Sequence, residues 1–389
     1  MEEEKHITLV IFGISGDLSK RKILPALSEL YKRNLLPSNF HIIGISRKKI
    51  TIGDFNLEKV FESKCEVIKM DVANIDEYRM LNERIKELNG NEYGENLFYL
   101  SVPPETLPNL IKNIGESKLE NYKTKLLFEK PFGTDYNSAE KLIKETKQYF
   151  ADDEVYHIDH YLAKQIVKDL ITWKSSPKNE ALLDKDNIKK IEIISLESLG
   201  IEGRGNFYEG TGALRDLIQS HLLEMLAIVI KGPHEDKVDV LRKLSIDEGR
   251  TVRGQYAGYN EDVGNIDSLT ETFASVTCYS SDPIWEGIPF TLTTGKALDR
   301  KVIEINITTN DGIIKFEQET KINIDGQIYD YEKILFDAID GDKTIFLGNE
   351  EILATWKLIN PILESWKQSS YIFKYDKGST LLDIIKKIK

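Results

Sequence analysis

Residues 7–27 read ITLVIFGISGDLSKRKILPAL, and this stretch decides the fold of the first half of the chain. The six residues ITLVIF have the length and composition of a buried strand. A turn that contains Gly13 and Gly16 follows, and apolar residues then recur at helical spacing from Ile23 to Tyr31. A strand, a glycine turn and a helix in this order predict the first unit of a βαβ series on a parallel sheet.

The same alternation continues to about residue 158. Short apolar runs predict further buried strands at residues 41–46, 65–72, 96–102, 123–129 and 155–158. Apolar positions at helical spacing predict helices between them at residues 74–90, 105–121 and 135–150. The pattern indicates a doubly wound parallel sheet with helices on its faces.

The second half of the chain has a different pattern. We expect a strand at residues 187–198 and a long, largely buried helix at residues 212–230. From about residue 269, β-rich runs follow one another without long helices between them, which favours an antiparallel sheet. Helices are expected at residues 331–340 and 350–368. The chain is therefore predicted to be α/β over residues 1–165 and α+β over residues 166–389.

Composition excludes several classes of protein. The chain has 389 residues and a net charge of −12, so nucleic acids and anionic membranes would be repelled. Its two cysteines lie far apart in sequence, which argues against a disulfide framework and fits a reducing cytoplasm. No stretch approaches the ~20 apolar residues that span a bilayer. We expect a cytoplasmic protein with no membrane or nucleic-acid partner.

The turn at residues 13–18 carries the first candidate binding residues. Gly13 and Gly16 permit a close approach of the backbone to a ligand, and the helix after them offers free N–H groups to a pyrophosphate. The spacing is G-x-x-G rather than G-x-G-x-x-G, so a plain strand-to-helix turn is the alternative. Its place in the first βα turn of an alternating series favours a dinucleotide.

The end of the second predicted strand bears on which dinucleotide is bound. An NAD-specific fold commonly has Asp or Glu there, whereas this chain has SRKK at residues 46–49. Arg47 offers a planar fork for a 2′-phosphate, and the two lysines add positive charge. A solvated basic turn is the alternative. We expect NADP as the cofactor, with NAD as the second candidate.

Residues 157–165, HIDHYLAKQ, hold two of the six histidines of the chain. The segment could be half a metal site, an acid–base pair, an anion cradle or a polar helix start. If it is extended, Asp159 and His160 point in opposite directions and cannot serve the same group. If a helix begins near His160, then His160 and Lys164 share one face at its N-terminus, where free N–H groups favour an anion.

The predicted helix at residues 212–230 contains a single histidine, His221. An unperturbed histidine pKa of ~6.5 suits a general base, although a lone histidine on an apolar helix is more often a core residue. Asp216 lies five residues before it, about 140° away around an α-helix. On that geometry the two side chains would flank a ligand and not share one contact.

Several longer segments occur in an order that resembles one family. They are GISGDLSKRKILPAL (13–27), EKPFG (129–133), IDHYLAK (158–164), EGRGNFY (202–208), LRDLIQSHLLEML (214–226), WEGIPF (285–290) and GKAL (295–298). Together they resemble the glucose-6-phosphate dehydrogenase family over most of the chain. The resemblance implies oxidation of glucose 6-phosphate to 6-phosphogluconolactone with hydride transfer to NADP, the first step of the oxidative pentose phosphate pathway.

The resemblance also implies a fold, an assembly and residue roles. The fold is a Rossmann-like NADP-binding domain followed by a substrate-binding and oligomerisation domain with a large, mainly antiparallel sheet, and the assembly is a homodimer or homotetramer. The general base is His221, oriented by Asp159. The substrate-binding residues are His160, Tyr161, Lys164, Lys130, Glu197, Asp216 and Lys296. The cofactor-binding residues are Gly13, Ser15, Gly16, Asp17, Leu18, Arg47, Tyr99 and Lys130.

This chain departs from the family pattern in places. It has His157, Ala163 and Gln165 where relatives usually carry Arg, Gly and Glu, and the region around residues 306–330 is shorter than in typical members. Three other interpretations stay open. They are a sugar oxidoreductase of the glucose–fructose oxidoreductase type, a non-catalytic sensor of a cofactor or sugar phosphate, and a metal site at His157 and His160.

Overall fold

The computed structural model describes residues 6–55, 57, 59–89, 94–119, 122–203, 205–319 and 329–388. The chain divides into two compact units, and each contains one large sheet. Unit 1 comprises Met1–Gly133, Asn137–Ala163 and Gln327–Asn349. Unit 2 comprises Thr134–Tyr136, Lys164–Gly326 and Glu350–Lys389. A C-terminal segment of the chain thus belongs to the N-terminal unit.

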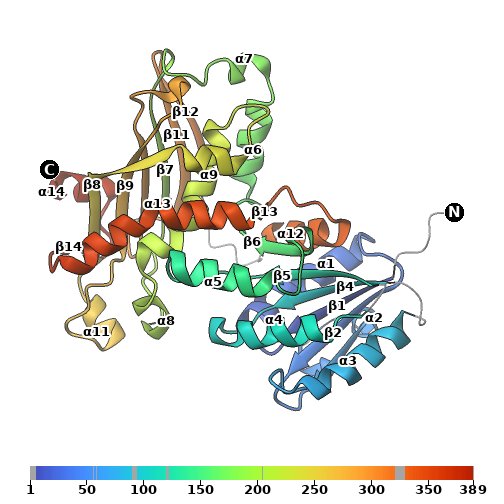
Figure 1. Cartoon of the computed structure of the whole chain (residues 1–389). Coiled ribbons are helices and arrows are strands. Elements are labelled where there is room, and N and C mark those ends of the chain that lie inside the picture. The colour runs from blue at the N-terminus through green and yellow to red at the C-terminus, as the bar shows by residue number, and fades with distance from the viewer. Residues whose placement is uncertain are drawn as a thin grey trace. The chain divides into compact units, whose positions relative to one another are not determined.

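Unit 1 is built on a seven-stranded sheet with the order β13-β6-β5-β4-β1-β2-β3 (Figure 1). All neighbouring strands are parallel except β13, which is antiparallel to β6. The order β3-β2-β1-β4-β5-β6 is that of a doubly wound dinucleotide fold, which confirms the predicted class. The strands are β1 (Ile7–Phe12), β2 (Phe40–Ser46), β3 (Cys65–Lys69), β4 (Glu95–Leu100), β5 (Lys123–Phe128), β6 (Val155–Ile158) and β13 (Phe346–Leu347).

Helices cover both faces of this sheet, because its central strands are apolar on both sides. Helix α1 packs with α12, and α3 packs with α4. The helical segments are η1 (Ser19–Ile23), α1 (Leu24–Lys32), η2 (Ile52–Phe55), α2 (Lys59–Glu62), α3 (Ile75–Leu88), η3 (Pro104–Thr106), α4 (Leu107–Glu116), α5 (Tyr136–Thr146), η4 (Asp152–Glu154) and α12 (Tyr329–Asp340).

Unit 2 is built on a second seven-stranded sheet with the order β12-β11-β7-β10-β9-β8-β14. Most pairs are antiparallel, as predicted, but β7 with β10 and β8 with β14 are parallel. The strands are β7 (Ile188–Leu196), β8 (Leu244–Tyr256), β9 (Phe273–Ser280), β10 (Phe290–Gly295), β11 (Val302–Thr309), β12 (Ile313–Glu319) and β14 (Phe373–Tyr375).

The helices of unit 2 include a long continuous rod that runs from η5 into α9 and packs on the sheet (Figure 1). Segment η5 contacts β7, β9 and β10, and α9 contacts α6 and α10. The helical segments are α6 (Gln165–Lys174), α7 (Pro177–Glu180), α8 (Gly205–Glu209), η5 (Leu214–Leu222), α9 (Leu223–Ile230), α10 (Lys237–Arg242), α11 (Tyr259–Val263), η6 (Pro283–Trp285), α13 (Asn349–Gln368) and α14 (Leu381–Ile388).

Three expectations about local structure were wrong or incomplete. Strand β8 was missed because the polar run IDEGR interrupts its apolar pattern. The helix expected near His160 begins only at Gln165. Segment η5 is a π-helix rather than an α-helix. Of the region around 306–330, which we expected to be shortened, residues 320–328 lie outside the described residues.

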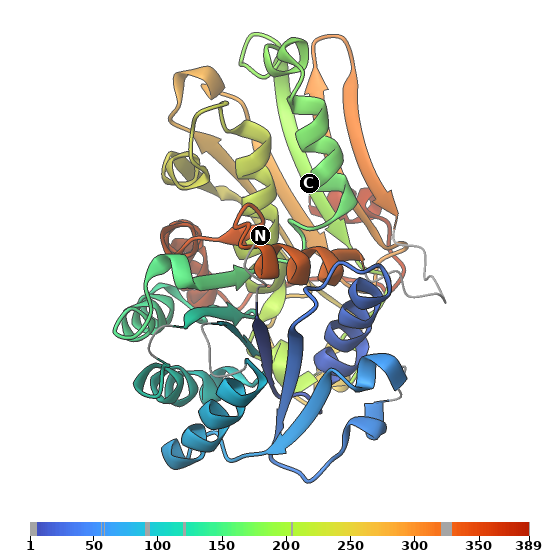
Figure 2. The same cartoon turned by 90° about the vertical axis from the view of Figure 1, so that its right-hand side faces the viewer.

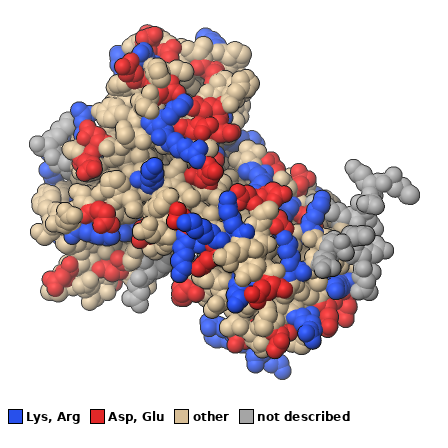
Figure 3. All heavy atoms as spheres, in the orientation of Figure 1, with Lys and Arg blue, Asp and Glu red and all other residues tan. Residues whose placement is uncertain are grey.

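Surface charge and hydropathy add two observations. Acidic and basic side chains are interspersed over the face shown in Figure 3, rather than gathered in a patch of one sign. Within the described ranges, no helix combines the length and the apolar character that crossing a bilayer requires.

The backbone at Gly13 gives a direct test of the turn that opens the fold. Its φ is +83°, and an added Cβ would lie 2.1 Å from the carbonyl oxygen of Ser101. We therefore expect Gly13→Ala to lower the free energy of unfolding by about 3 kcal/mol, from the left-handed backbone and overpacking together. Urea unfolding followed by circular dichroism measures this change.

Gly53→Ala is the matched control, because its Cβ would meet nothing closer than Thr51 Oγ1 at 3.8 Å. This variant should be at least as stable as the wild type. Equal stability of the two variants would contradict the proposed constraint at Gly13.

Candidate active site

The turn after β1 is closed by its own backbone. The Gly16 N–H donates to the Gly13 carbonyl at 2.9 Å, and the Gly13 N–H donates to the Ile45 carbonyl at 3.2 Å. The Ser19 hydroxyl also donates to the Gly13 carbonyl, at 3.1 Å. A Cβ at Gly13 would lie 2.1 Å from the Ser101 carbonyl oxygen, so only bare backbone fits at the switch point between β1 and β4. Dinucleotide folds place a glycine turn of this kind beside the pyrophosphate.

The other predicted cofactor residues of this turn surround the same backbone. Ser15 and Asp17 are exposed, and Leu18 is half-buried. The Asp17 carboxylate forms an ion pair with Arg21 at 2.6 Å, one helical turn later. The residues present therefore fit a dinucleotide at the start of η1.

Arg47 follows the carboxyl end of β2, which pairs with β1 in register. Its side chain is exposed, as are those of Lys48 and Lys49. Within the described part of the chain, none of the three forms an ion pair with a carboxylate. The Lys48 N–H donates to the Ser46 hydroxyl at 3.1 Å, which shapes the turn. These cations are therefore available to an anion at this edge of the sheet.

Tyr99 and Lys130 lie at the ends of β4 and β5, which are neighbours. Tyr99 is fully buried, and its hydroxyl donates to Glu129 Oε1 at 2.5 Å. Burial raises the pKa of the Glu129 carboxyl to about 7, although hydrogen bonds from Tyr99 and Tyr331 oppose the rise. Lys130 follows directly and is joined to Pro131 by a cis peptide bond. Glu129 and Tyr331 were not found from the sequence.

The segment HIDHYLAKQ changes from strand to turn at residue 159. His157 and Ile158 close β6, and residues 160–163 form a turn. The Asp159 carboxylate accepts the Tyr161 N–H at 2.9 Å, and its carbonyl accepts the Leu162 N–H at 3.1 Å. These short-range bonds use the backbone groups that a helix would need, so the helix starts later. Lys164 is the extended N-cap of α6.

The structure thus corrects the helical argument for His160 and Lys164. They do not lie one turn apart on a helix face, because no helix contains both. His160 lies beside the Tyr161 ring, with centroids 5.0 Å apart and planes at 70°. Asp159 is buried, as is Tyr161.

His157 belongs to the core of unit 1. Its Nε2 meets Asn349 Oδ1 at 2.8 Å, and its ring packs against Phe128 and Phe132 with centroids 5.2 and 4.8 Å away. Burial lowers the pKa of His157 to about 4, so the ring is neutral. Among the described residues, no group of three or more His, Cys, Asp or Glu side chains is placed to hold a metal ion.

Unit 2 gathers three of the predicted sugar-binding residues. Glu197 follows β7 and Lys296 follows β10, and these parallel strands pair Leu196 with Gly295. The Lys296 ammonium contacts the Glu197 carboxylate and lies 3.4 Å from Asp216 Oδ2. It also lies over the ring of Tyr208, 5.0 Å from the centroid. Alternating cationic and anionic groups of this kind can donate to and accept from sugar hydroxyls.

The π-helix η5 supplies Asp216 to this cluster and also carries His221. In a π-helix the backbone bonds join residues five apart, so side chains five apart lie next to each other along the axis. Asp216 and His221 therefore share a face of η5, which corrects the separation expected for an α-helix. His221 is buried, with 2% of its surface exposed. Short π-helical segments occur frequently at functional sites.

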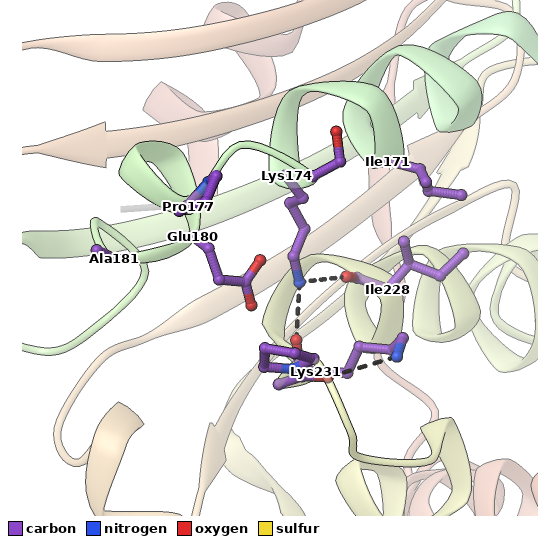
Figure 4. A pocket seen from close by; sticks show the side chains of 10 residues that line it. Ile171, Lys174, Pro177, Glu180, Ala181, Ile228 and Lys231 are labelled. Atoms are coloured by element: carbon purple, nitrogen blue, oxygen red, sulfur yellow. Dashed lines mark hydrogen bonds between the residues drawn. The ribbon is translucent and has the colours of Figure 1, made fainter.

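A cavity of about 660 Å³ elsewhere in unit 2 is not part of this cluster (Figure 4). It lies between α6, α7 and the end of α9. Its half-buried Lys174 donates to the carbonyls of Ile228, Val229 and Lys231 at 2.8 to 3.0 Å. Ile228 and Val229 lie in the last turn of α9 and Lys231 follows it, so Lys174 caps that helix.

Unit 1 has a doubly wound sheet with a glycine turn at its switch point. Unit 2 has a cluster of charged side chains that suits the hydroxyls of a sugar. Together these features indicate the class of nicotinamide-dependent oxidoreductases. Comparison with known proteins identifies the family. The family model described as "Glucose-6-phosphate dehydrogenase, NAD binding domain" matches residues 10–169. The model described as "Glucose-6-phosphate dehydrogenase, C-terminal domain" matches residues 177–327 and 310–383. The chain belongs to the glucose-6-phosphate dehydrogenase family.

Individual relatives match this chain over nearly its whole length. Glucose-6-phosphate 1-dehydrogenase of Chlamydia muridarum is 30% identical, with 95% of this chain and 92% of that protein covered. The enzyme of the same name from Aggregatibacter actinomycetemcomitans is 31% identical, with 95% and 93% covered. A solved structure of glucose-6-phosphate dehydrogenase in complex with glucose 6-phosphate matches with a TM-score of 0.89 and 26% identity, and 99% and 97% of the two chains are covered.

The buried histidine makes the stability of unit 1 depend on pH. The folded pKa of His157 is about 4 against 6.5 for the unperturbed group. Below pH 6.5 the unfolded chain takes up a proton that the folded chain does not, so stability present above pH 6.5 is lost as the pH falls toward 4. The loss is about 3 kcal/mol for a shift of this size.

We expect His157→Gln to show a smaller loss of unfolding free energy than the wild type between pH 7 and pH 4. Urea unfolding at both pH values, compared between the two proteins, measures the difference. His234→Gln is the control, since that ring is exposed to solvent. If the wild type and His157→Gln lost equal stability, His157 would not be the group that titrates.

Proposed function

We propose that this protein oxidises glucose 6-phosphate at C1 to 6-phosphogluconolactone, with NADP as the hydride acceptor. The observation that carries the proposal is the arrangement of unit 2. Glu197 and Lys296 follow the carboxyl ends of two parallel strands, and Asp216 on η5 lies beside Lys296. His221 lies one π-helical repeat from Asp216. Membership of the family supports the same reaction.

The reaction breaks a C1–H bond and an O1–H bond of the cyclic hemiacetal, and it forms the C1=O1 double bond of the lactone. The nicotinamide of NADP, when bound, would supply the acceptor for the hydride that leaves C1. The proton on O1 goes to the imidazole of His221, which is the proposed general base because its ordinary pKa lies near neutrality. Asp159 is the carboxylate proposed to orient this imidazole and to stabilise its cationic form.

The remaining predicted residues divide between the two ends of the substrate. His160, Tyr161 and Lys164 are proposed to bind the phosphate, and they offer one phenol and two basic groups. Glu197, Asp216 and Lys296 are proposed to bind the sugar hydroxyls. Lys130 is proposed to lie between sugar and cofactor, since it follows a parallel strand at the edge where ligands bind in such folds.

The preference for NADP over NAD is part of the proposal. It is supported by Arg47, whose exposed guanidinium follows β2, where NAD-binding folds commonly place an acidic residue. Tyr99 and the turn at residues 13–18 complete the proposed cofactor site.

A homodimer or homotetramer is the proposed assembly, and light scattering during gel filtration measures it. The cytoplasm is the proposed location, supported by two cysteines that are both free. The first test of the function is a spectrophotometric assay with glucose 6-phosphate and either NADP or NAD. Failure to reduce either nucleotide would reject an enzymatic role and favour a sensor.

His221→Asn tests the general base. We expect kcat to fall by ~10²–10⁴ with little change in KM for glucose 6-phosphate, because asparagine cannot take the O1 proton. Initial rates at saturating NADP measure both constants.

Lys164→Ala is the contrasting variant. It should raise KM for glucose 6-phosphate and leave any rate with free glucose unchanged, because only the phosphate loses a partner. If His221→Asn kept its kcat, another group would have to be the base.

Arg47→Asp tests cofactor choice. We expect the ratio of kcat/KM for NADP to that for NAD to fall at least tenfold, because the 2′-phosphate would meet a carboxylate instead of a guanidinium. Arg79→Asp, an exposed position on α3, controls for the change in net charge. An unchanged ratio in Arg47→Asp would remove the argument for NADP.

A further inference from the structure

Tyr331 links two parts of unit 1 that are far apart in sequence. It lies in α12, and its hydroxyl donates to Glu129 Oε1 at 3.3 Å. The same oxygen accepts the Tyr99 hydroxyl at 2.5 Å. Two phenols from different elements therefore converge on one carboxylate oxygen beside Lys130.

The two phenols that meet this carboxylate are buried. Tyr99 and Tyr331 have 0% and 8% of their surfaces exposed, and burial raises the Glu129 pKa. Glu129 itself is half-buried, and its carboxylate holds both hydroxyls in place because the two tyrosines are withdrawn from water. The hydroxyl end of the Tyr331 ring is thereby held in place.

Helix α12 holds the backbone end of the same side chain. It packs against α1, the helix that continues from the glycine turn (Figure 2). An ion pair between Arg33 and Glu332, 3.0 Å long, joins the end of α1 to the residue next to Tyr331. The backbone that carries Tyr331 is therefore held against α1.

The fixed ring lies against His160. The Tyr331 and His160 rings are stacked, with centroids 6.4 Å apart and planes at 21°, and Tyr161 meets His160 edge-on. His160 lies in a turn and not in a helix or strand, so regular secondary structure does not set its direction. The two flanking rings restrict it instead, because aromatic pairs favour such geometries.

We propose that Tyr331 is a positioning residue for substrate recognition, which acts by orienting the His160 imidazole toward the substrate phosphate. This inference rests on the proposed function, in which His160 binds that phosphate. The Glu129 carboxylate is the anchor, and Tyr331 transmits its position to His160. Selectivity for a phosphorylated sugar then depends on a residue about 170 positions away along the chain, as the numbering shows.

The test is a double-mutant cycle on the full-length protein, with KM for glucose 6-phosphate as the readout. Tyr331→Leu should raise this KM about three- to tenfold, the effect expected for loss of an aromatic pair. The kcat and the KM for NADP should stay within twofold. In a His160→Ala background, Tyr331→Leu should cause no further rise, because the group it positions is gone.

Two further variants separate positioning from general destabilisation. Tyr331→Phe keeps the stacked ring and loses the bond to Glu129, so its KM should fall between those of the wild type and Tyr331→Leu. Tyr78→Leu removes another buried tyrosine of unit 1, whose hydroxyl donates to the Val72 carbonyl, and should leave KM unchanged. An equal rise of KM with and without His160 would overturn the proposal.

A second measurement is independent of turnover. With ¹³C-labelled histidine, the six imidazole signals can be followed by NMR, and His160→Ala identifies the signal of residue 160. Tyr331→Leu should move that signal and weaken its response to added inorganic phosphate, while the other histidine signals stay in place. If the signal does not move, the inference fails even when the wild type reduces NADP. If Tyr331→Leu moves the His160 signal but the wild type reduces no nucleotide, the inference about positioning holds and only the proposed function fails.

Discussion

The parallel pairing of strands is the constraint on which the candidate site depends. In unit 1, β1 pairs with both β2 and β4 in parallel, so the glycine turn, Arg47 and the end of β4 meet at one edge of the sheet. In unit 2, the parallel pair β7–β10 within a mainly antiparallel sheet brings Glu197 and Lys296 together. An antiparallel pair would have sent these two residues to opposite ends of the strands.

The second constraint is the irregular backbone at points where chemistry is expected. The π-helix η5 aligns Asp216 with His221, and the turn after β6 lets Asp159 bond to backbone rather than begin a helix. Such segments depart from the hydrogen-bond pattern of an α-helix or a strand, and they persist where the surrounding packing holds them. Segment η5 is held by its buried side chains. The turn after β6 is held by His157, which packs against Phe128 and Phe132.

Sequence reasoning succeeded where pattern and period were strong. The strand β1, the glycine turn and the alternation through β6 were predicted, because continuous apolar runs and a strand–glycine–helix order have few other solutions. It failed where a local pattern was broken or a competing bond won. The polar run in β8 hid a strand, and the Asp159 side chain delayed the start of α6.

The amino-acid sequence was enough to predict the class of each half, the position of the glycine turn and which side chains carry charge or a titratable ring. These follow from periodicity and composition, which act over a few residues. Only the tertiary structure decided that Lys296 lies between Glu197 and Asp216, that Asp216 and His221 share a face, and that Tyr331 reaches Glu129 and His160. Such pairings join residues up to about 200 positions apart, and they arise from sheet order and packing, which no local pattern records.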